Sequence, residues 1–256
     1  MVRIEDKFLM PRERMSDILA TLRAHLSPSE FTEGARYTTV ESLYLDSPDL
    51  VCLRDHVAGA RERFKIRLRR YAPDGVFARG AAFLEVKRKV DAICTKERLA
   101  LDPASIERLI AGAPLVPSPA LTRHNHQMSD RKIASRLSSL RELLEAHDAR
   151  PRVTVTYERR AFEGDGVRVT VDDDVRAVFR RAIDHRVAAT LRREPAFAWA
   201  ASRSARFDPA RMVIVEVKHL AGRPAWLDES MQAVGSGATN FSKYCFSMLD
   251  AIRRLA

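Results

Sequence analysis

Residues 63–71 read RFKIRLRRY, and residues 83–89 read FLEVKRK. In both segments apolar side chains alternate with charged ones, which is the period-two pattern of a β-strand that buries one face. The charged residues that alternate with the apolar ones are Lys65, Arg67, Arg69, Glu85, Lys87 and Lys89. The two segments therefore predict strands with one apolar face and one ionic face.

The same alternation recurs along the chain, so we expect a sheet built from segments far apart in the sequence. The predicted strands are residues 2–8, 37–46, 63–71, 83–89, 152–162, 167–172 and 212–219, of which 37–46 has the weakest pattern. Helical periodicity predicts helices over residues 12–26, 103–111, 130–147 and 241–255. Groups of strands interrupted by helices, without a regular βαβ rhythm, favour an α+β domain on a mostly antiparallel sheet or barrel.

Three stretches fall outside this pattern. Residues 113–127 are rich in proline and are predicted to form a loop, which places His124 and His126 at the surface rather than in a metal site. Residues 186–211 show no period from which an element can be predicted, and residues 235–237 read as a flexible connection. No compositional shift divides the chain, so we expect one domain over residues 1–256.

Composition excludes several classes of protein. The 256 residues are 46% hydrophobic and 30% charged, as in globular proteins rather than disordered or collagen-like chains. No apolar run approaches the roughly 20 residues that span a bilayer. The first residues lack the apolar segment of a secretion signal, and the three cysteines lack paired or metal-type spacing. We therefore expect a soluble, cytoplasmic protein without a membrane span.

The charge of the chain favours an anionic partner. The formal net charge is +10, which suits nucleic acid, an anionic membrane surface or a phosphate-rich molecule. Of the 44 basic residues 36 are arginines, and seven of the eight lysines lie in or beside alternating segments or in one Ser-Lys-Tyr tripeptide. The lysines, with their compact ammonium groups, are thus concentrated in and near the predicted strands. Few aromatic residues accompany the basic ones, which argues against nucleic acid.

Two interpretations of the ionic strand faces remain open from the residues alone. Each face can be the solvated side of an ordinary sheet. Alternatively the strands close into a barrel whose lumen holds the charges. The residues that would line this lumen are Glu5, Lys7, Lys65, Arg67, Arg69, Glu85, Lys87, Lys89, Arg168, Glu216 and Lys218. Because desolvation costs several kcal/mol per ion, a lumen with this excess of cations would need a polyanionic ligand such as a chain of phosphates.

An ordered series of motifs resembles the VTC domain, the polyphosphate polymerase module of the vacuolar transporter chaperone complex, within the triphosphate tunnel metalloenzyme (CYTH-like) superfamily. The matching segments are residues 3–8, 42–46, 64–71, 83–89, 157–162, 167–172, 215–218 and 242–244. The resemblance implies an eight-stranded antiparallel tunnel barrel with helices packed outside. It also implies a bound nucleoside triphosphate or polyphosphate and a divalent metal, Mn or Mg.

The family pattern also implies roles for single residues. Arg67, Arg69, Lys87, Arg159 and Arg168 would clamp the reacting phosphates. Further substrate contacts would come from Lys7 and Lys243, from Lys96 or Arg98, and from the lumen lysines Lys65, Lys89 and Lys218. Glu216 would hold the metal, and Glu5 is either a second metal contact or a partner that orients nearby cations. Arg159 and Arg160 are neighbours that face opposite ways, and the family pattern selects Arg159 for the tunnel. Asp172 is a weaker candidate for a site role.

The opening motif departs from the wider superfamily, because Arg3 stands where many triphosphatases and cyclases have a first Glu. This substitution favours transfer of the γ-phosphate of ATP to polyphosphate over a two-metal hydrolysis. Hydrolysis of tripolyphosphate or a nucleoside triphosphate is the alternative, and a non-catalytic polyphosphate-binding module is a third reading that Glu216 argues against. The expected partners are ATP and polyphosphate, with a membrane protein as a further possible partner.

Overall fold

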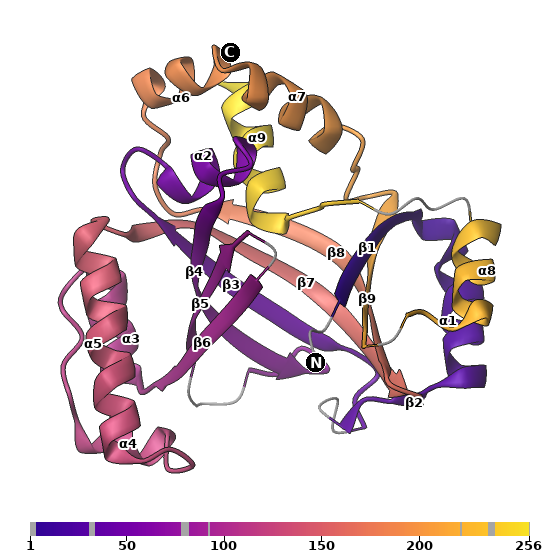
Figure 1. Ribbon diagram of the computed structural model, residues 1–256, viewed down its shortest axis with the longest axis horizontal. Helices are drawn as coiled ribbons and strands as arrows, with labels where there is room; N and C mark the ends of the chain where they lie inside the picture. The colour runs from indigo at the N-terminus through magenta and orange to yellow at the C-terminus, as the bar shows by residue number, and fades with distance from the viewer. Residues whose placement is uncertain are drawn as a thin grey trace.

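The computed structural model describes residues 4–30, 34–77, 82–91, 93–220, 222–234 and 239–255. Nine strands form one antiparallel sheet in which eight long strands run in the order β1-β9-β8-β7-β3-β4-β5-β6, while the short β2 pairs with β7 (Figure 1). The strands are β1 (Ile4–Pro11), β2 (Ser27–Pro28), β3 (Thr38–Asp46), β4 (Glu62–Pro73), β5 (Ala82–Val90), β6 (Ile93–Leu101), β7 (Arg150–Gly164), β8 (Val167–Phe179) and β9 (Met212–His219). The predicted α+β class and the eight antiparallel strands are confirmed.

The sheet curls into a tunnel. Lys87 on β5 lies 3.5 Å from Glu5 on β1, although five strands separate these two in the sheet. Such a contact requires the two ends of the sheet to face each other across a lumen. Within the described residues the outer strands β1 and β6 do not pair with one another. Side chains rather than a backbone ladder bring the two ends of the sheet together.

Helices cover the sheet in three groups (Figure 1). The helices are η1 (Arg12–Arg14), α1 (Met15–His25), α2 (Val51–Val57), α3 (Pro103–Ala111), α4 (Pro119–His124), α5 (Asp130–Ala146), α6 (His185–Arg192), α7 (Pro195–Ser204), α8 (Ala225–Ala233) and α9 (Lys243–Arg254). The apolar faces of β1, β8 and β9 pack against α1 and α8. Those of β3 to β6 pack against α3, α4 and α5. Both groups lie outside the sheet, as predicted.

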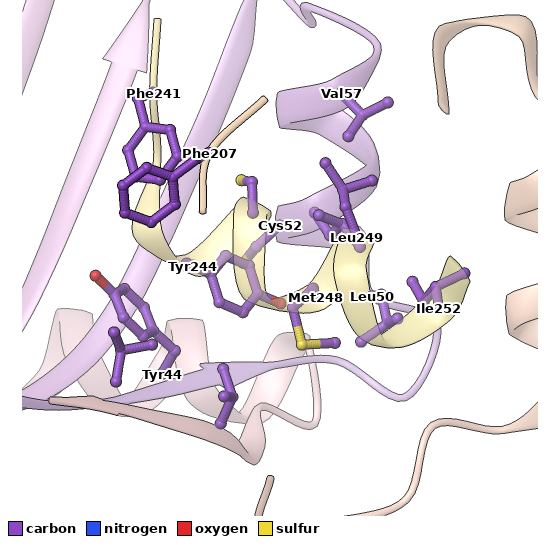
Figure 2. Packing of buried hydrophobic residues seen from close by; sticks show 14 of the residues in the cluster. Tyr44, Leu50, Cys52, Val57, Phe207, Phe241, Tyr244, Met248, Leu249 and Ile252 are labelled. Carbon is purple, nitrogen blue, oxygen red and sulfur yellow. The ribbon is translucent and has the colours of Figure 1, made fainter. Parts of the chain in front are cut away.

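Helix α9 has a different position, because it covers the inner face of the sheet at one end. Tyr44 of β3 and Tyr157 of β7 share this face with the charged residues, and both belong to the hydrophobic cluster of Tyr244 and Met248. Figure 2 shows Tyr44 beside Tyr244, whose rings stack with centroids 5.0 Å apart. The first turn of α9 therefore lies next to the charged lumen.

Sequence patterns missed several elements for local physical reasons. Strand β6 escapes the period-two pattern because its first half is exposed and its last residues, Leu99 to Leu101, are all buried. The predicted loop over 113–127 is wrong in part, since Ser118 caps α4 and Pro119 occupies its first turn. Residues 186–211 hold most of α6 and all of α7. The proposed connection at 235–237 lies outside the described residues.

Candidate functional site

Cross-strand register brings the predicted lumen residues into adjacent rows. In β4 and β5, Arg67 lies opposite Glu85 and Lys65 lies opposite Lys87. In β6, Arg98 and Lys96 continue these two rows as the partners of Glu85 and Lys87. Directly opposed residues share a face of the sheet. The charges of three consecutive strands therefore point into the same space.

Glu85 is the buried anion of this side of the tunnel. Its carboxylate lies 2.7 Å from Arg67, 2.6 Å from Lys96 and 2.5 Å from Arg98. Burial would raise the pKa of Glu85, but Arg67 and Arg69 outweigh burial and hold the pKa well below its usual value. Arg67, Lys96 and Arg98 thus share one carboxylate, so this cluster keeps an excess of positive charge.

Arg69 is the most deeply buried cation of the same rows, with 6% of its surface exposed. Its guanidinium donates to Ser42 Oγ at 3.0 Å and to the Tyr157 hydroxyl at 3.1 Å. Both acceptors are neutral, and within the described residues no carboxylate lies within ion-pair distance of this guanidinium. A buried charge in this setting is costly without a counter-ion.

Asp172 forms the second buried anion, on β8. Arg159 of β7 holds it through two hydrogen bonds of 2.6 and 2.8 Å, and Lys243 of α9 lies 2.5 Å away. Burial would raise the pKa of Asp172, but Arg159 and Lys243 outweigh this effect and lower it. Arg159 lies opposite Asp172 in strand register and shares its face of the sheet, whereas Arg160 pairs with Glu158 at 3.7 Å.

Glu5 and Glu216 form an acidic pair on β1 and β9. Lys7 lies 2.9 Å from Glu5 and 4.0 Å from Glu216, and Lys218 lies 2.8 Å from Glu216 and 3.7 Å from Glu5. Lys87 reaches Glu5 from the opposite wall. Burial would raise the pKa of Glu216, but Lys218 and Lys7 hold it well below the usual value, so this carboxylate stays ionised.

This acidic pair fits a hard divalent cation that also binds substrate. Magnesium-type sites in proteins commonly use one or two carboxylates, with phosphates and waters completing the shell. In strand register Glu216 lies opposite Thr170, whose hydroxyl is buried and has no hydrogen-bond partner. Among the described residues no group of three or more His, Cys, Asp or Glu side chains could hold a metal alone. The residues therefore suit a cation shared with phosphates rather than a closed protein cage.

Lys65 joins the lumen to α2 and α9. Its ammonium lies 3.2 Å from His56 Nδ1 and donates to Ser242 Oγ at 3.0 Å. Burial, with Lys7 and Lys87 nearby, lowers the pKa of Lys65, and burial with Lys65 lowers the pKa of His56 to about 3. A neutral His56 accepts a hydrogen bond from Lys65 and leaves its charge uncompensated. No sequence pattern pointed to His56, because it lies on helix α2 outside the strands.

The remaining predicted residues lie at the margins of these clusters. Arg168 is the cross-strand partner of Lys218, which places it beside the acidic pair. Lys89 lies further along β5, opposite Arg63 and Cys94, and no contact joins it to the buried carboxylates of the described tunnel. His124 is exposed and bonds to Ala120 of its own helix, consistent with a surface position.

A buried hydrogen-bond hub fixes the start of α9. The Asp46 carboxylate, which is fully buried, accepts from the backbone of Ser47, Cys52 and Leu53 and from the hydroxyl of Tyr244. Tyr244 follows Lys243 directly. This contact therefore holds the first turn of α9 in place and with it the lysine that reaches Asp172.

Comparison with family models agrees with the motifs. The family model described as the VTC domain matches residues 2–251. No curated protein matches the chain. Among solved structures, a putative adenylate cyclase of Bacillus halodurans has a TM-score of 0.49 at 9% identity and covers 94% of each chain. A putative adenylate cyclase of Vibrio parahaemolyticus has a TM-score of 0.44 at 9% identity, and the match covers 97% of this chain and 99% of that chain. A protein of Pyrococcus horikoshii has a TM-score of 0.44 at 14% identity, and the match covers 99% of each chain. No helix in the described part of the chain is long and apolar enough to cross a membrane.

Proposed function

The chain belongs to the VTC domain family, and from this membership and the charged tunnel we propose that it transfers the γ-phosphate of ATP to polyphosphate. In this reaction the bond between the γ-phosphorus and its bridging oxygen breaks and ADP leaves. A new P–O–P bond forms with the terminal phosphate of the polymer. The observation that carries the proposal is the buried Arg69, a cation in the lumen whose two hydrogen-bond partners are both neutral.

The residues of the tunnel would act by position and charge. Phosphoryl transfer passes through a loose transition state with spread negative charge, so preorganised cations can supply much of the stabilisation. Arg69 and Lys65 would contact phosphate directly, because they have neutral partners in the protein. Arg67, Arg159 and Lys243 would contribute from positions fixed by Glu85 and Asp172. The acceptor phosphate is already ionised near neutral pH, so no protein nucleophile is needed.

Glu216 and Glu5 would hold Mn or Mg together with the substrate. A divalent cation bound there would neutralise charge on the transferring phosphates. Lys7 and Lys218 keep both carboxylates ionised before it binds, since they lower the pKa of each. The pair would thus stay ready for a cation near neutral pH.

Hydrolysis of tripolyphosphate or a nucleoside triphosphate is the second candidate. The acidic pair supports it, because Glu5 is a second carboxylate beside Glu216 and a two-metal hydrolysis could use both. The two reactions differ in whether water or phosphate attacks. The tunnel charges support either one.

The test is to incubate the purified chain with ATP and Mn and to resolve the products by gel, together with assays for ADP and orthophosphate. We expect ADP and a ladder of phosphate polymers. ADP with orthophosphate alone would establish a hydrolase instead. Binding of polyphosphate without any ADP would establish a binding module. The Glu216→Gln variant is the matched control for phosphate released by a contaminant.

A further inference from the structure

Strand β8 loses one of its neighbours halfway along. β9 pairs with it only as far as Asp172, whereas β7 stays paired as far as Phe179. The change coincides with a bulge, since Asp174 has a φ of 51° and the β7–β8 register shifts there. Bulges commonly end pairing and redirect side chains. Within the described residues the far half of β8 is thus an open sheet edge.

The backbone hydrogen bonds between β7 and β8 show which groups of β8 face the open edge. Arg180 donates its N–H to the carbonyl of Arg152, on the side of β7, at 2.8 Å. Backbone groups alternate in direction along an antiparallel strand. Every second residue before Arg180 therefore also faces β7, and Ala177 and Phe179 direct their N–H and C=O groups to the vacant side.

A cavity of about 830 Å³ lies along this edge. It is bounded by β8, by α9 and by residues 205–209, which lead into β9. Its apolar lining includes Val175, Ile183, Phe207 and Phe246. In Figure 1 the end of β8 lies close to α9. The volume falls in the range of ligand pockets, and the half of β8 that β9 leaves unpaired forms one of its walls.

The rim of this cavity is basic. Four arginines and two aspartates line it: Arg176, Arg181, Arg253, Arg254, Asp208 and Asp250. Asp250 is shared by two of the arginines at 2.9 Å each, and Arg176 pairs with Asp174 at 2.7 Å. Cations thus exceed anions at the rim. A second copy of this chain docked by the same edge would place like charges side by side, which is unfavourable.

We propose that the edge of β8 at Ala177 and Phe179 binds an extended acidic peptide, which adds a strand to the sheet. Strand addition draws its affinity from main-chain hydrogen bonds and its specificity from alternate side chains that enter pockets. Here the apolar residues of the peptide would enter the cavity beside Phe246, and its carboxylates would meet the rim arginines. This surface is separate from the tunnel, so the inference is independent of the reaction performed there.

The experiment uses a fluorescent synthetic peptide in which Glu alternates with Val and Phe, and measures its binding by anisotropy. Ala177→Pro removes one edge N–H without removing a hydrogen bond to β7, a place where strands tolerate proline. We expect it to weaken binding at least tenfold, whereas Ala177→Ser, which keeps the N–H, should bind like wild type. Hydrogen exchange should show slower exchange of the Ala177 and Phe179 amides when the peptide is bound.

Three results would overturn the proposal. One is equal binding by the Ala177→Pro and Ala177→Ser variants, and another is unchanged exchange at both amides in saturating peptide. The third is a wild-type dimer that Ala177→Pro converts to monomer, which would assign the edge to a second copy of the chain. A peptide with Lys in place of Glu tests the charge argument and should bind at least tenfold more weakly. Thermal melts of both Ala177 variants establish that they are folded.

Discussion

Replacing Arg69 by Met tests whether the buried guanidinium of the tunnel exists for an anionic ligand. The side chain is 6% exposed and donates to two neutral hydroxyls, those of Ser42 and Tyr157. A charge-assisted hydrogen bond contributes about 1.5 to 3 kcal/mol. At about 1.4 kcal/mol for each tenfold change, losing one such bond to phosphate should weaken tripolyphosphate binding by about 10- to 100-fold.

The stability of the free protein should respond differently. Met removes two hydrogen bonds but also relieves the desolvation of an uncompensated charge, and each effect amounts to a few kcal/mol. We therefore expect the melting temperature without ligand to stay within about 4 °C of wild type. A purely structural arginine would instead lower stability and leave affinity alone.

The assay is titration calorimetry with tripolyphosphate, together with thermal melts with and without ligand. Arg70→Met is the matched control, because Arg70 is the next residue, is exposed and pairs with Glu41 at 2.5 Å on the opposite face. It removes the same net charge outside the tunnel. Wild-type affinity in Arg69→Met, or an equal loss in Arg70→Met, would refute the reasoning.

Three further predictions concern Glu216, Lys65 and Tyr244 of α9. Glu216→Gln should abolish turnover while tripolyphosphate binding persists, measured by product gels and calorimetry; wild-type turnover would place the metal elsewhere. Burial lowers the pKa of Lys65, so tripolyphosphate affinity should fall as pH rises toward the ordinary lysine value of 10.5, and Lys65→Arg should flatten this dependence; an equal fall in both proteins would contradict it. Tyr244→Phe removes the hydrogen bond to Asp46 and should weaken tripolyphosphate binding several-fold in a folded protein. Unchanged affinity would show that Lys243 is positioned without that contact.

The sequence predicted much of the sheet because half-buried strands leave a direct signature. Val215 and Val217 alternate with Glu216 and Lys218, and both valines are buried against the outer helices. The same alternation identified the inner cations. It could not show which carboxylate meets which cation, because that depends on register between strands such as β4 and β5, which period-two patterns leave undetermined.

Features of the site that come from helices were not predictable in this way. His56 and the hub at Asp46 depend on how α2 and α9 pack, and nothing in their local patterns indicates an inner position. Asp172 looked like the first of three adjacent aspartates. Only the curl of the sheet and the first turn of α9 make it the partner of Arg159 and Lys243.

The distribution of carboxylates explains how such a basic tunnel can fold before it binds anything. Glu85 and Asp172 each give the cations around them a shared counter-charge, and the acidic pair does so for Lys7 and Lys218. Arg69 and Lys65 receive only neutral partners in the described structure. Because a buried ion without a counter-charge is costly, these two would gain most from a bound phosphate chain. Affinity would then depend on a few uncompensated cations, while the paired ones preserve the shape of the tunnel.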